Sequence, residues 1–245
     1  MKSGMYAALS GNMASEQRLD ILTSNLANVN TAGFKRDRIA FESVLGAVKK
    51  PSQVTETLTD APLLSTSRIV TDFTAGALKL TSNTLDVALD GDGFFVVNTP
   101  NGKAYTRQGN FHLDASNKLL NASNFEVLAG GGPVTIKGSK VVIDAKGGIV
   151  VDGSQVGTLD VVDFPKPYQL KKEGGAQFVP TSPEVEGQPA KNTSVRQGFL
   201  EESNVNSMLE MALLMDTSRS NESCAKMIQS FDNMVGKAVN ELGKL

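Results

Sequence analysis

The sequence predicts an α+β protein in which long N- and C-terminal helices pair as a coiled coil and a central, mainly antiparallel β domain is inserted between them. All eight methionines lie in the first 13 residues or after position 207. All nine prolines lie between Pro51 and Pro189, and proline inside a helix costs roughly 3 kcal/mol. Short apolar runs separated by turn-forming residues fill the middle of the chain, as is typical of an antiparallel β domain.

The N-terminal helix is predicted from apolar and small residues that recur in steps of three and four, which places them on one face of a helix. Asn30 and Gly33 bring turn chemistry, so we expect the helix to end near Asn30. It would contain about 27 residues and measure roughly 40 Å. The face is formed by Met5, Ala8, Asn12, Ser15, Leu19, Leu22, Leu26 and Val29.

The C-terminal helix is predicted to begin at Ser207, because Ser207 and Glu210 have the spacing of a capping box. Ser203 and Asn206 are alternative starting points. No proline interrupts the following 37 or so residues. The predicted face is formed by Leu213, Thr217, Ser220, Cys224, Met227, Phe231, Met234, Ala238 and Leu245, flanked by Ile228, Val235 and Leu242.

The middle of the chain predicts many short strands. Apolar and small or acidic residues alternate from Leu85 to Asp90, and runs such as 94–97, 141–143 and 159–164 are separated by glycine-rich turns. Their spacing favours a barrel-like or sandwich-like domain. We therefore expect these segments in chain order: 1–35, N-terminal helix; 36–69, connector; 70–190, β domain; 191–206, return connector; 207–245, C-terminal helix.

Composition excludes several classes of function. The chain has 24 basic and 26 acidic residues, so no global field attracts nucleic acid or an anionic membrane. No stretch approaches the ~20 apolar residues of a membrane span, and the first residues make a poor secretory leader. The single cysteine, Cys224, excludes an internal disulfide and is expected to be a buried small residue.

We expect no enzyme activity, no cofactor and no metal. His112 is the only histidine and is interpreted as a surface residue on a strand, although a Ser-His-Asp arrangement stays open. The run Asp90–Gly93 is interpreted as a tight turn, because Phe94 and Phe95 stand where an EF-hand-like loop needs an oxygen ligand and a glycine.

The two predicted helical faces are longer than one partner can cover. Their remaining apolar surface favours contact with further copies, and repeated head-to-tail contacts make rings or filaments. The alternative is an ordinary two-helix stalk that buries itself. The residues we expect at a subunit interface are Met5, Leu19, Leu22, Asn25, Leu26, Asn28, Val29, Gly33, Phe34, Met227, Phe231, Met234 and Leu242.

Three segments resemble the bacterial flagellar rod, hook and hook-associated axial proteins. The run 24–36, SNLANVNTAGFKR, is similar to the N-terminal signature of that family, with Ala32 where the family usually has proline. The run 85–97 and the following 105–111 resemble the start of the family's β domain. The run 198–206 resembles the segment that leads into the C-terminal helix.

This resemblance implies a structural subunit of the flagellar basal-body rod, whose terminal helices polymerise into a hollow tube that transmits torque across the periplasm and lets later subunits pass. It implies as partners copies of the same chain, neighbouring rod subunits and the flagellar type III export apparatus, without a cleaved signal peptide. The proximal-rod member most like the distal rod subunit is the expected type. A distal rod or hook-type subunit is the near alternative, and a secreted binding module with a coiled-coil stalk is the alternative from another class.

The first motif also has a physical interpretation of its own. Asn25 and Asn28 lie three residues apart, so their amides share a helix face and can bond neighbouring backbone or another subunit. Lys35, Arg36 and Arg38 are expected on a solvated or intersubunit surface. We hypothesise that these cations meet Glu201 and Glu202 of another copy.

Overall fold

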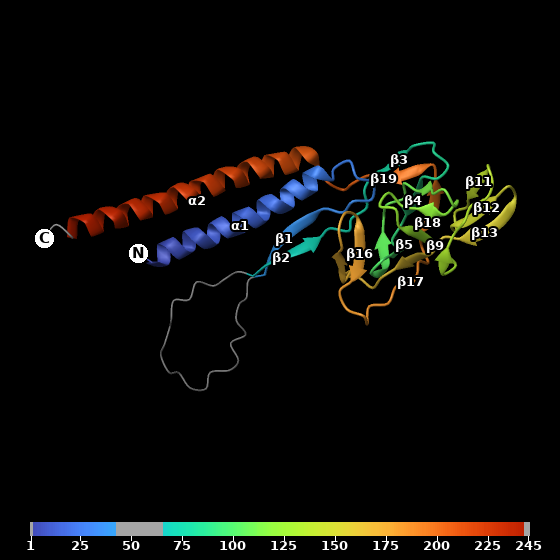
Figure 1. Cartoon of the computed structure of the whole chain (residues 1–245), viewed down its shortest axis with the longest axis horizontal. Helices are drawn as coiled ribbons and strands as arrows, with labels where there is room; N and C mark the ends of the chain where they lie inside the picture. The colour runs from blue at the N-terminus through green and yellow to red at the C-terminus, as the bar shows by residue number, and fades with distance from the viewer. Residues whose placement is uncertain (1, 43–65, 243–245) are drawn as a thin grey trace, which may run out of the picture. The chain divides into compact units, whose positions relative to one another are not determined.

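The computed structural model describes residues 2–42 and 66–242, which form mostly antiparallel β-sheets with one helix near each end (Figure 1). The helices are α1 (Lys2–Ala27) and α2 (Ser207–Leu242). The strands are β1 (Asp37–Glu42), β2 (Thr66–Thr71), β3 (Leu78–Leu80), β4 (Val87–Asp90), β5 (Phe94–Thr99), β6 (Gly102–Thr106), β7 (His112–Leu113), β8 (Leu119–Leu120), β9 (Glu126–Ala129), β10 (Gly132–Pro133), β11 (Val141–Ile143), β12 (Gly148–Val151), β13 (Ser154–Thr158), β14 (Val161–Asp163), β15 (Leu170–Lys172), β16 (Gln177–Pro180), β17 (Gln188–Pro189), β18 (Ser194–Gln197) and β19 (Phe199–Glu201).

The chain divides into two compact units. The helical unit contains α1, α2 and the hairpin of β1 and β2, from residues 1–27, 37–72 and 206–245. The β unit contains residues 28–36 and 73–205. The segment that follows α1 and the segment that precedes α2 therefore belong to the β unit rather than to the helices that they continue.

The predicted fold class is wrong in making a coiled coil its defining element. The chain is mainly β, and although the two helices lie side by side (Figure 1), their described side chains do not form the apolar core that a coiled coil requires. Among the described side chains, α2 buries only Glu210 and Thr217, both polar. On α1 the buried residues are Ile21, Leu22 and the polar Asn25. Residues spaced three and four apart therefore do form a contact face between the helices, but several of the buried residues on it are polar.

The ends of both helices depend on local turn chemistry. Helix α1 ends at Ala27, three residues earlier than expected, because the chain turns where Thr31 N–H donates to the Asn28 carbonyl. Helix α2 begins at Ser207 as expected, but its cap is the preceding residue: Asn206 Oδ1 accepts a hydrogen bond from Leu209 N–H at 3.1 Å. The rival starting point Asn206 thus supplies the N-cap, and Glu210 is available for another contact.

The segment expected to be a plain connector contains a two-stranded ribbon. Strands β1 and β2 pair antiparallel with Asp37 opposite Thr71 and Ile39 opposite Ile69. Residues 43–65, which include most of the expected connector, lie outside the described residues. The ribbon belongs to the helical unit.

The β unit is built around a ten-stranded antiparallel sheet. Its main path runs β15-β16-β6-β5-β9-β8-β7, while β10 pairs with β9, β14 pairs with β5, and β17 pairs with β14. A three-stranded sheet, β11-β12-β13, and the pairs β18-β4 and β19-β3 complete the unit. The last two pairs join strands from the beginning and the end of the unit's sequence.

Strand β5 lies between two apolar cores. Its residues Phe95 and Val97 belong to a large cluster of aliphatic side chains, whereas Phe94 belongs to an aromatic cluster with Phe164 and Phe178. Because successive side chains of a strand point to opposite faces, an uninterrupted apolar run satisfies a strand that is buried on both sides. This explains the sequence Phe94–Val97.

Candidate functional site

The most distinctive polar feature of the β unit is a buried carboxylate that holds two cations. Glu201, at the end of β19, is 1% exposed. Its Oε1 accepts a hydrogen bond from Lys35 Nζ at 2.5 Å and from Gly76 N–H at 2.9 Å. Its Oε2 lies 3.2 Å from Arg107 Nη1. Three segments that are far apart in the sequence therefore meet at one side chain, and we call this set the Glu201 cluster.

The two cations of the Glu201 cluster have further partners that offset the cost of their burial. Lys35 Nζ also donates to the carbonyl of Thr74 at 2.7 Å. Arg107 Nη2 donates to the carbonyl of Gly91 at 2.7 Å, and its guanidinium lies 5.4 Å from the centre of the Phe94 ring. Buried charges persist only when they are paired and hydrogen-bonded, and these residues meet both conditions.

Residues 28–36 enter the β unit through Gly33 and Phe34. Gly33 has φ of +66°, and a Cβ at this position would lie 2.3 Å from the backbone carbon of Arg107. Its N–H donates to the Glu201 carbonyl at 2.7 Å. Phe34 is 1% exposed, and Lys172 Nζ lies 4.1 Å from the centre of its ring. Only glycine fits this combination of conformation and close approach.

The segments on either side of the Glu201 cluster also bond to each other directly. Arg36 N–H donates to Asn204 Oδ1 at 2.8 Å, and Asn204 Nδ2 donates to the carbonyl of Thr74 at 3.2 Å. Lys172 Nζ donates to the carbonyl of Lys35 at 2.8 Å. Residues 35–36, which follow α1 in the sequence, and Asn204, which precedes α2, are therefore hydrogen-bonded to each other and to neighbouring residues of the β unit.

These contacts correct the interpretation of the cationic run. Lys35 does not lie on a solvated or intersubunit surface, because it is 1% exposed and meets Glu201 of its own chain. Glu202 is exposed and lies 3.5 Å from Lys79 of the same chain. Arg36 is half-buried and Arg38 is exposed, so among the three cations only Arg38 lies in solvent as expected. The sequence separation of 166 residues between Lys35 and Glu201 hid this pair from sequence reasoning.

The helical unit has a smaller polar site at Asn25. The Asn25 side chain donates through Nδ2 to the carbonyl of Asp37 at 2.8 Å, and its Oδ1 accepts from Asp37 N–H at 2.9 Å. Nδ2 also lies 3.4 Å from Glu210 Oε2. The predicted bond from this amide to neighbouring backbone is thus present. It joins α1, the start of β1 and the first turn of α2.

The predicted interface residues fall into four groups. Leu22, Asn25, Gly33 and Phe34 are buried within this chain, and Leu19, Leu26, Asn28 and Val29 are half-buried. Met227 and Met234 are each 52% exposed. The side chains of Met5, Phe231 and Leu242 lie outside the described residues. Whether any of these residues contacts another subunit remains a prediction.

Sequence reasoning missed the strongest exposed apolar patch. Met208, Met211 and Met215 are 82%, 47% and 58% exposed, and their spacing places them along one side of the first turns of α2. On α1, Leu9 and Met13 are 47% and 63% exposed. The methionine distribution carried this signal, but the predicted face began at Leu213 and omitted the first turn.

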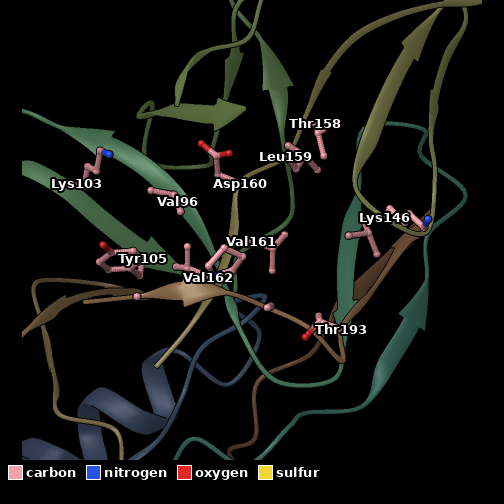
Figure 2. Close-up of a pocket in the computed structure, with 14 residues that line it drawn as sticks. Val96, Lys103, Tyr105, Lys146, Thr158, Leu159, Asp160, Val161, Val162 and Thr193 are labelled. Carbon is pink, nitrogen blue, oxygen red and sulfur yellow. The ribbon is translucent and has the colours of Figure 1, made fainter. Parts of the chain in front are cut away.

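The β unit also contains a hollow of about 420 Å³ beside β5, β6 and β14 (Figure 2). Figure 2 shows Lys103 and Lys146 at opposite ends of it, so their charges do not converge on one point. Asp160 is held by the N–H groups of Gly130 and Gly131 at 2.9 and 2.8 Å. Burial raises the pKa of Tyr105. This arrangement supplies no nucleophile with an adjacent base.

The remaining candidate residues of the sequence analysis make contacts that are expected of residues with a structural role. His112 is exposed on β7, with its Nε2 3.2 Å from Asn124 Oδ1. Cys224 is half-buried in α2, where its sulfur lies close to Gly11. Asp90 pairs with Arg196, and Asp92 pairs with Lys166, both at 2.6 Å. Within residues 2–42 and 66–242, no cluster of three potential ligands has the arrangement needed to hold a metal ion.

Together, these features define a class of protein. A β unit with closed cores holds residues 28–36 and 199–205 through a buried charge cluster, and a helical unit leaves methionines and leucines in solvent. Such a division is that of a structural subunit that works in association with other molecules. In the described part of the chain, neither helix combines the length and apolarity needed to span a membrane.

Comparison with known proteins agrees with this class. Residues 5–35 match the family described as flagella basal body rod protein, residues 88–152 match the flagellar hook protein FlgE/F/G D1 domain, and residues 196–241 match the flagellar basal body rod FlgEFG protein C-terminal region. The chain belongs to the family of flagellar basal-body rod proteins. It is therefore a structural protein of the bacterial flagellum that assembles with other basal-body proteins.

Relatives of two kinds align along nearly the whole chain. The flagellar basal-body rod protein FlgF of Rhizobium meliloti (strain 1021) is 34% identical over 248 residues, covering 99% of each chain. FlgF of Caulobacter vibrioides is 31% identical over 248 residues, covering 100% of each. FlgG of Bacillus subtilis (strain 168) is 31% identical over 265 residues, covering 98% of this chain and 99% of the relative.

Proposed function

We propose that this protein is an axial building block of the rod, in which copies and related rod subunits pack through their terminal helices into a hollow tube. This tube transmits torque across the periplasm and lets later subunits pass. The chain has no catalytic role in the proposal. The flagellar type III export apparatus carries it across the inner membrane without cleavage of a signal peptide.

The observation that carries the proposal is the exposure of apolar side chains along both helices. Eight of the twelve large apolar side chains that are exposed in the described residues belong to α1 or α2. Contiguous apolar side chains in water favour association, and methionine adapts to irregular partner surfaces. The exposed members are Leu9, Met13, Met208, Leu209, Met211, Met215, Met227 and Met234.

The alignments support a place in the rod like that of FlgF, which is the expected proximal-rod type. Alignments with FlgF relatives span 246 to 248 residues, close to the length of this 245-residue chain. Alignments with the FlgG relatives of Bacillus subtilis and Borreliella burgdorferi span 265 residues, so they contain positions that this chain lacks. We infer that the shorter chain corresponds to the FlgF type.

The test places charge on the methionine patch of α2. Full-length protein with Met208→Glu, Met211→Glu and Met215→Glu is produced in cells that lack the natural protein, and its amount in isolated basal bodies is measured. We expect the variant to fold, because these side chains are exposed, and to be lost from basal bodies with loss of swimming.

A matched control adds the same charge at three exposed positions along another side of α2: Ala212→Glu, Ser223→Glu and Ser230→Glu. This control is expected to retain much more incorporation than the methionine variant. Equal incorporation of the methionine variant and the natural protein would contradict the proposal that this face of α2 carries the subunit contacts.

A further inference from the structure

The turn between β5 and β6 contains the only asparagine of the sequence that is followed by glycine, Asn101 before Gly102. Asparagine is one of the chemically labile residues of proteins. Its carboxamide is most open to attack by the next peptide nitrogen when the next residue has no side chain to obstruct the approach. Every other asparagine of the chain is followed by a residue with a Cβ atom. Asn101 therefore differs from the others in its covalent surroundings.

The structure leaves this dipeptide open to solvent. Asn101 and Gly102 are both exposed, and Gly102 has φ of +120°. Thr99 pairs with Gly102 across the hairpin, so Asn101 lies in the two-residue loop that joins the strands. No described atom lies within 4 Å of a Cβ placed at Gly102. Packing around Gly102 therefore does not prevent the turn from changing shape.

A second hairpin holds the Asn101 carboxamide. Nδ2 of Asn101 donates a hydrogen bond to Oε1 of Glu173 at 3.1 Å. Glu173 lies in the turn between β15 and β16, where its N–H donates to the carbonyl of Gln177 at 3.0 Å. The bond between the two hairpins opposes movement of the carboxamide and of the turn that carries it.

We propose that Asn101 is a site of spontaneous deamidation and that Glu173 slows the reaction. The backbone nitrogen of Gly102 attacks Cγ of Asn101, so that a bond forms between these atoms and the bond from Cγ to Nδ2 breaks. Nδ2 leaves as ammonia, with the proton that the Gly102 nitrogen gives up. Water then opens the cyclic imide at either carbonyl and gives aspartate or isoaspartate. No oxidant or reductant takes part, and the inference does not depend on rod assembly.

The reaction changes the contact between the two hairpins. A carboxylate accepts hydrogen bonds but does not donate them, so the product cannot donate to Glu173. It also places a second negative charge beside the Glu173 carboxylate. The turn that follows β5 thereby loses its bond to the turn that follows β15.

The first experiment follows deamidation in purified full-length protein by peptide mass spectrometry, during incubation at neutral and at mildly alkaline pH. Asn117 and Asn124 are internal controls, because both are exposed between strands and are followed by residues with side chains. We expect conversion at Asn101 to be several-fold faster than at either control. It should also become faster as the pH rises, because the attacking nitrogen must lose its proton. Equal conversion at the three asparagines, or a rate at Asn101 that does not change with pH, would overturn the proposal.

The second experiment tests the restraint by Glu173. Glu173→Ala removes the acceptor of the Asn101 amide, and we expect conversion at Asn101 to become a few-fold faster. Glu184→Ala removes a negative charge at another exposed position of the β unit and is expected to leave the rate unchanged. An unchanged or slower conversion in the Glu173→Ala protein, or an equal acceleration in both variants, would contradict the role of Glu173.

Discussion

The two units of this protein treat polar and apolar side chains in opposite ways. The β unit buries Phe94, Phe95 and Phe178 almost completely and encloses an ion cluster at Glu201. The helical unit leaves Met208 and Met215 in water and uses the polar residues Asn25 and Glu210 at buried positions. The β unit encloses its apolar cores, whereas the helical unit leaves apolar side chains that association would cover under the proposed function.

The difference teaches that each unit uses its buried polar side chains for a task of its own. The Glu201 cluster holds residues 28–36 and 199–205 within the β unit, through bonds to Lys35 and to the N–H of Gly33. Four substitutions test this comparison, beginning with the largest expected effect.

Glu201→Ala is expected to destabilise the β unit by about 3–5 kcal/mol, because it leaves Lys35 and Arg107 buried without their counter-charge. The chain has no tryptophan, so urea unfolding is followed by circular dichroism. Glu202→Ala is the control. Glu202 is 49% exposed in its pair with Lys79, and a change below about 1 kcal/mol is expected there. Equal effects of the two substitutions would remove the special role of Glu201.

Gly33→Ala is expected to cost about 1–3 kcal/mol, because alanine resists the positive φ and its Cβ overlaps the backbone of Arg107. The measurement is again the midpoint of urea unfolding. Gly132→Ala is the matched control, since no atom lies within 4 Å of a Cβ at that position. A Gly33→Ala protein as stable as the control would show that this close approach does not constrain the fold.

Asn25→Leu is expected to cost about 1–3 kcal/mol locally, because the N–H and C=O of Asp37 lose their partner. Hydrogen exchange should become faster at the N–H of Asp37 and in the first turn of α2, with no change in β5. Thr23→Leu, at an exposed position of α1, serves as the control. Faster exchange throughout the β unit would contradict the separation of the two units.

The smallest effect is expected for the surface pair of Asp92 and Lys166. The hydrogen bond from Lys166 lowers the pKa of Asp92 below its ordinary value of 3.8, against the opposing effect of burial. When folding lowers the pKa of a carboxyl group, that group stabilises the folded protein at pH values above the pKa that it has in the unfolded chain. This contribution is lost as the pH falls through the folded pKa.

The natural protein and the Lys166→Met variant are therefore compared by thermal unfolding between about pH 2 and pH 6. The natural protein is expected to be slightly more stable above about pH 4, and the difference should disappear toward pH 2. A difference in midpoint that is constant over this range would show that the ion pair does not cause it.

Sequence patterns predicted the parts of the fold that depend on local residues. The absence of proline and the spacing of Leu213, Thr217 and Cys224 located α2, and the run Phe94–Val97 located β5. The error lay in assuming that three-four spacing implies an apolar core. Helical periodicity shows which residues share a face but not whether Asn25, Glu210 or leucine fills the contact.

The candidate sites were harder to predict, for a reason that is also physical. Glu201 looks like any surface glutamate in a run that contains Glu202, and only the pairing of β19 with β3 brings it to Gly76 and Lys35. The Asn25 amide was predictable as a backbone partner because its position beside Leu22 and Leu26 is local. Its actual acceptor, Asp37, depended on the placement of β1.

The order in which the members of the Glu201 cluster occur along the chain has a consequence for biosynthesis and for the proposed export. Lys35 and Arg107 precede their carboxylate by 166 and 94 residues. A chain that emerges amino end first has both cations long before it has the anion that neutralises them. The final closure of the β unit must wait until four-fifths of the polypeptide is available, so a partly emerged chain stays short of its most stable state.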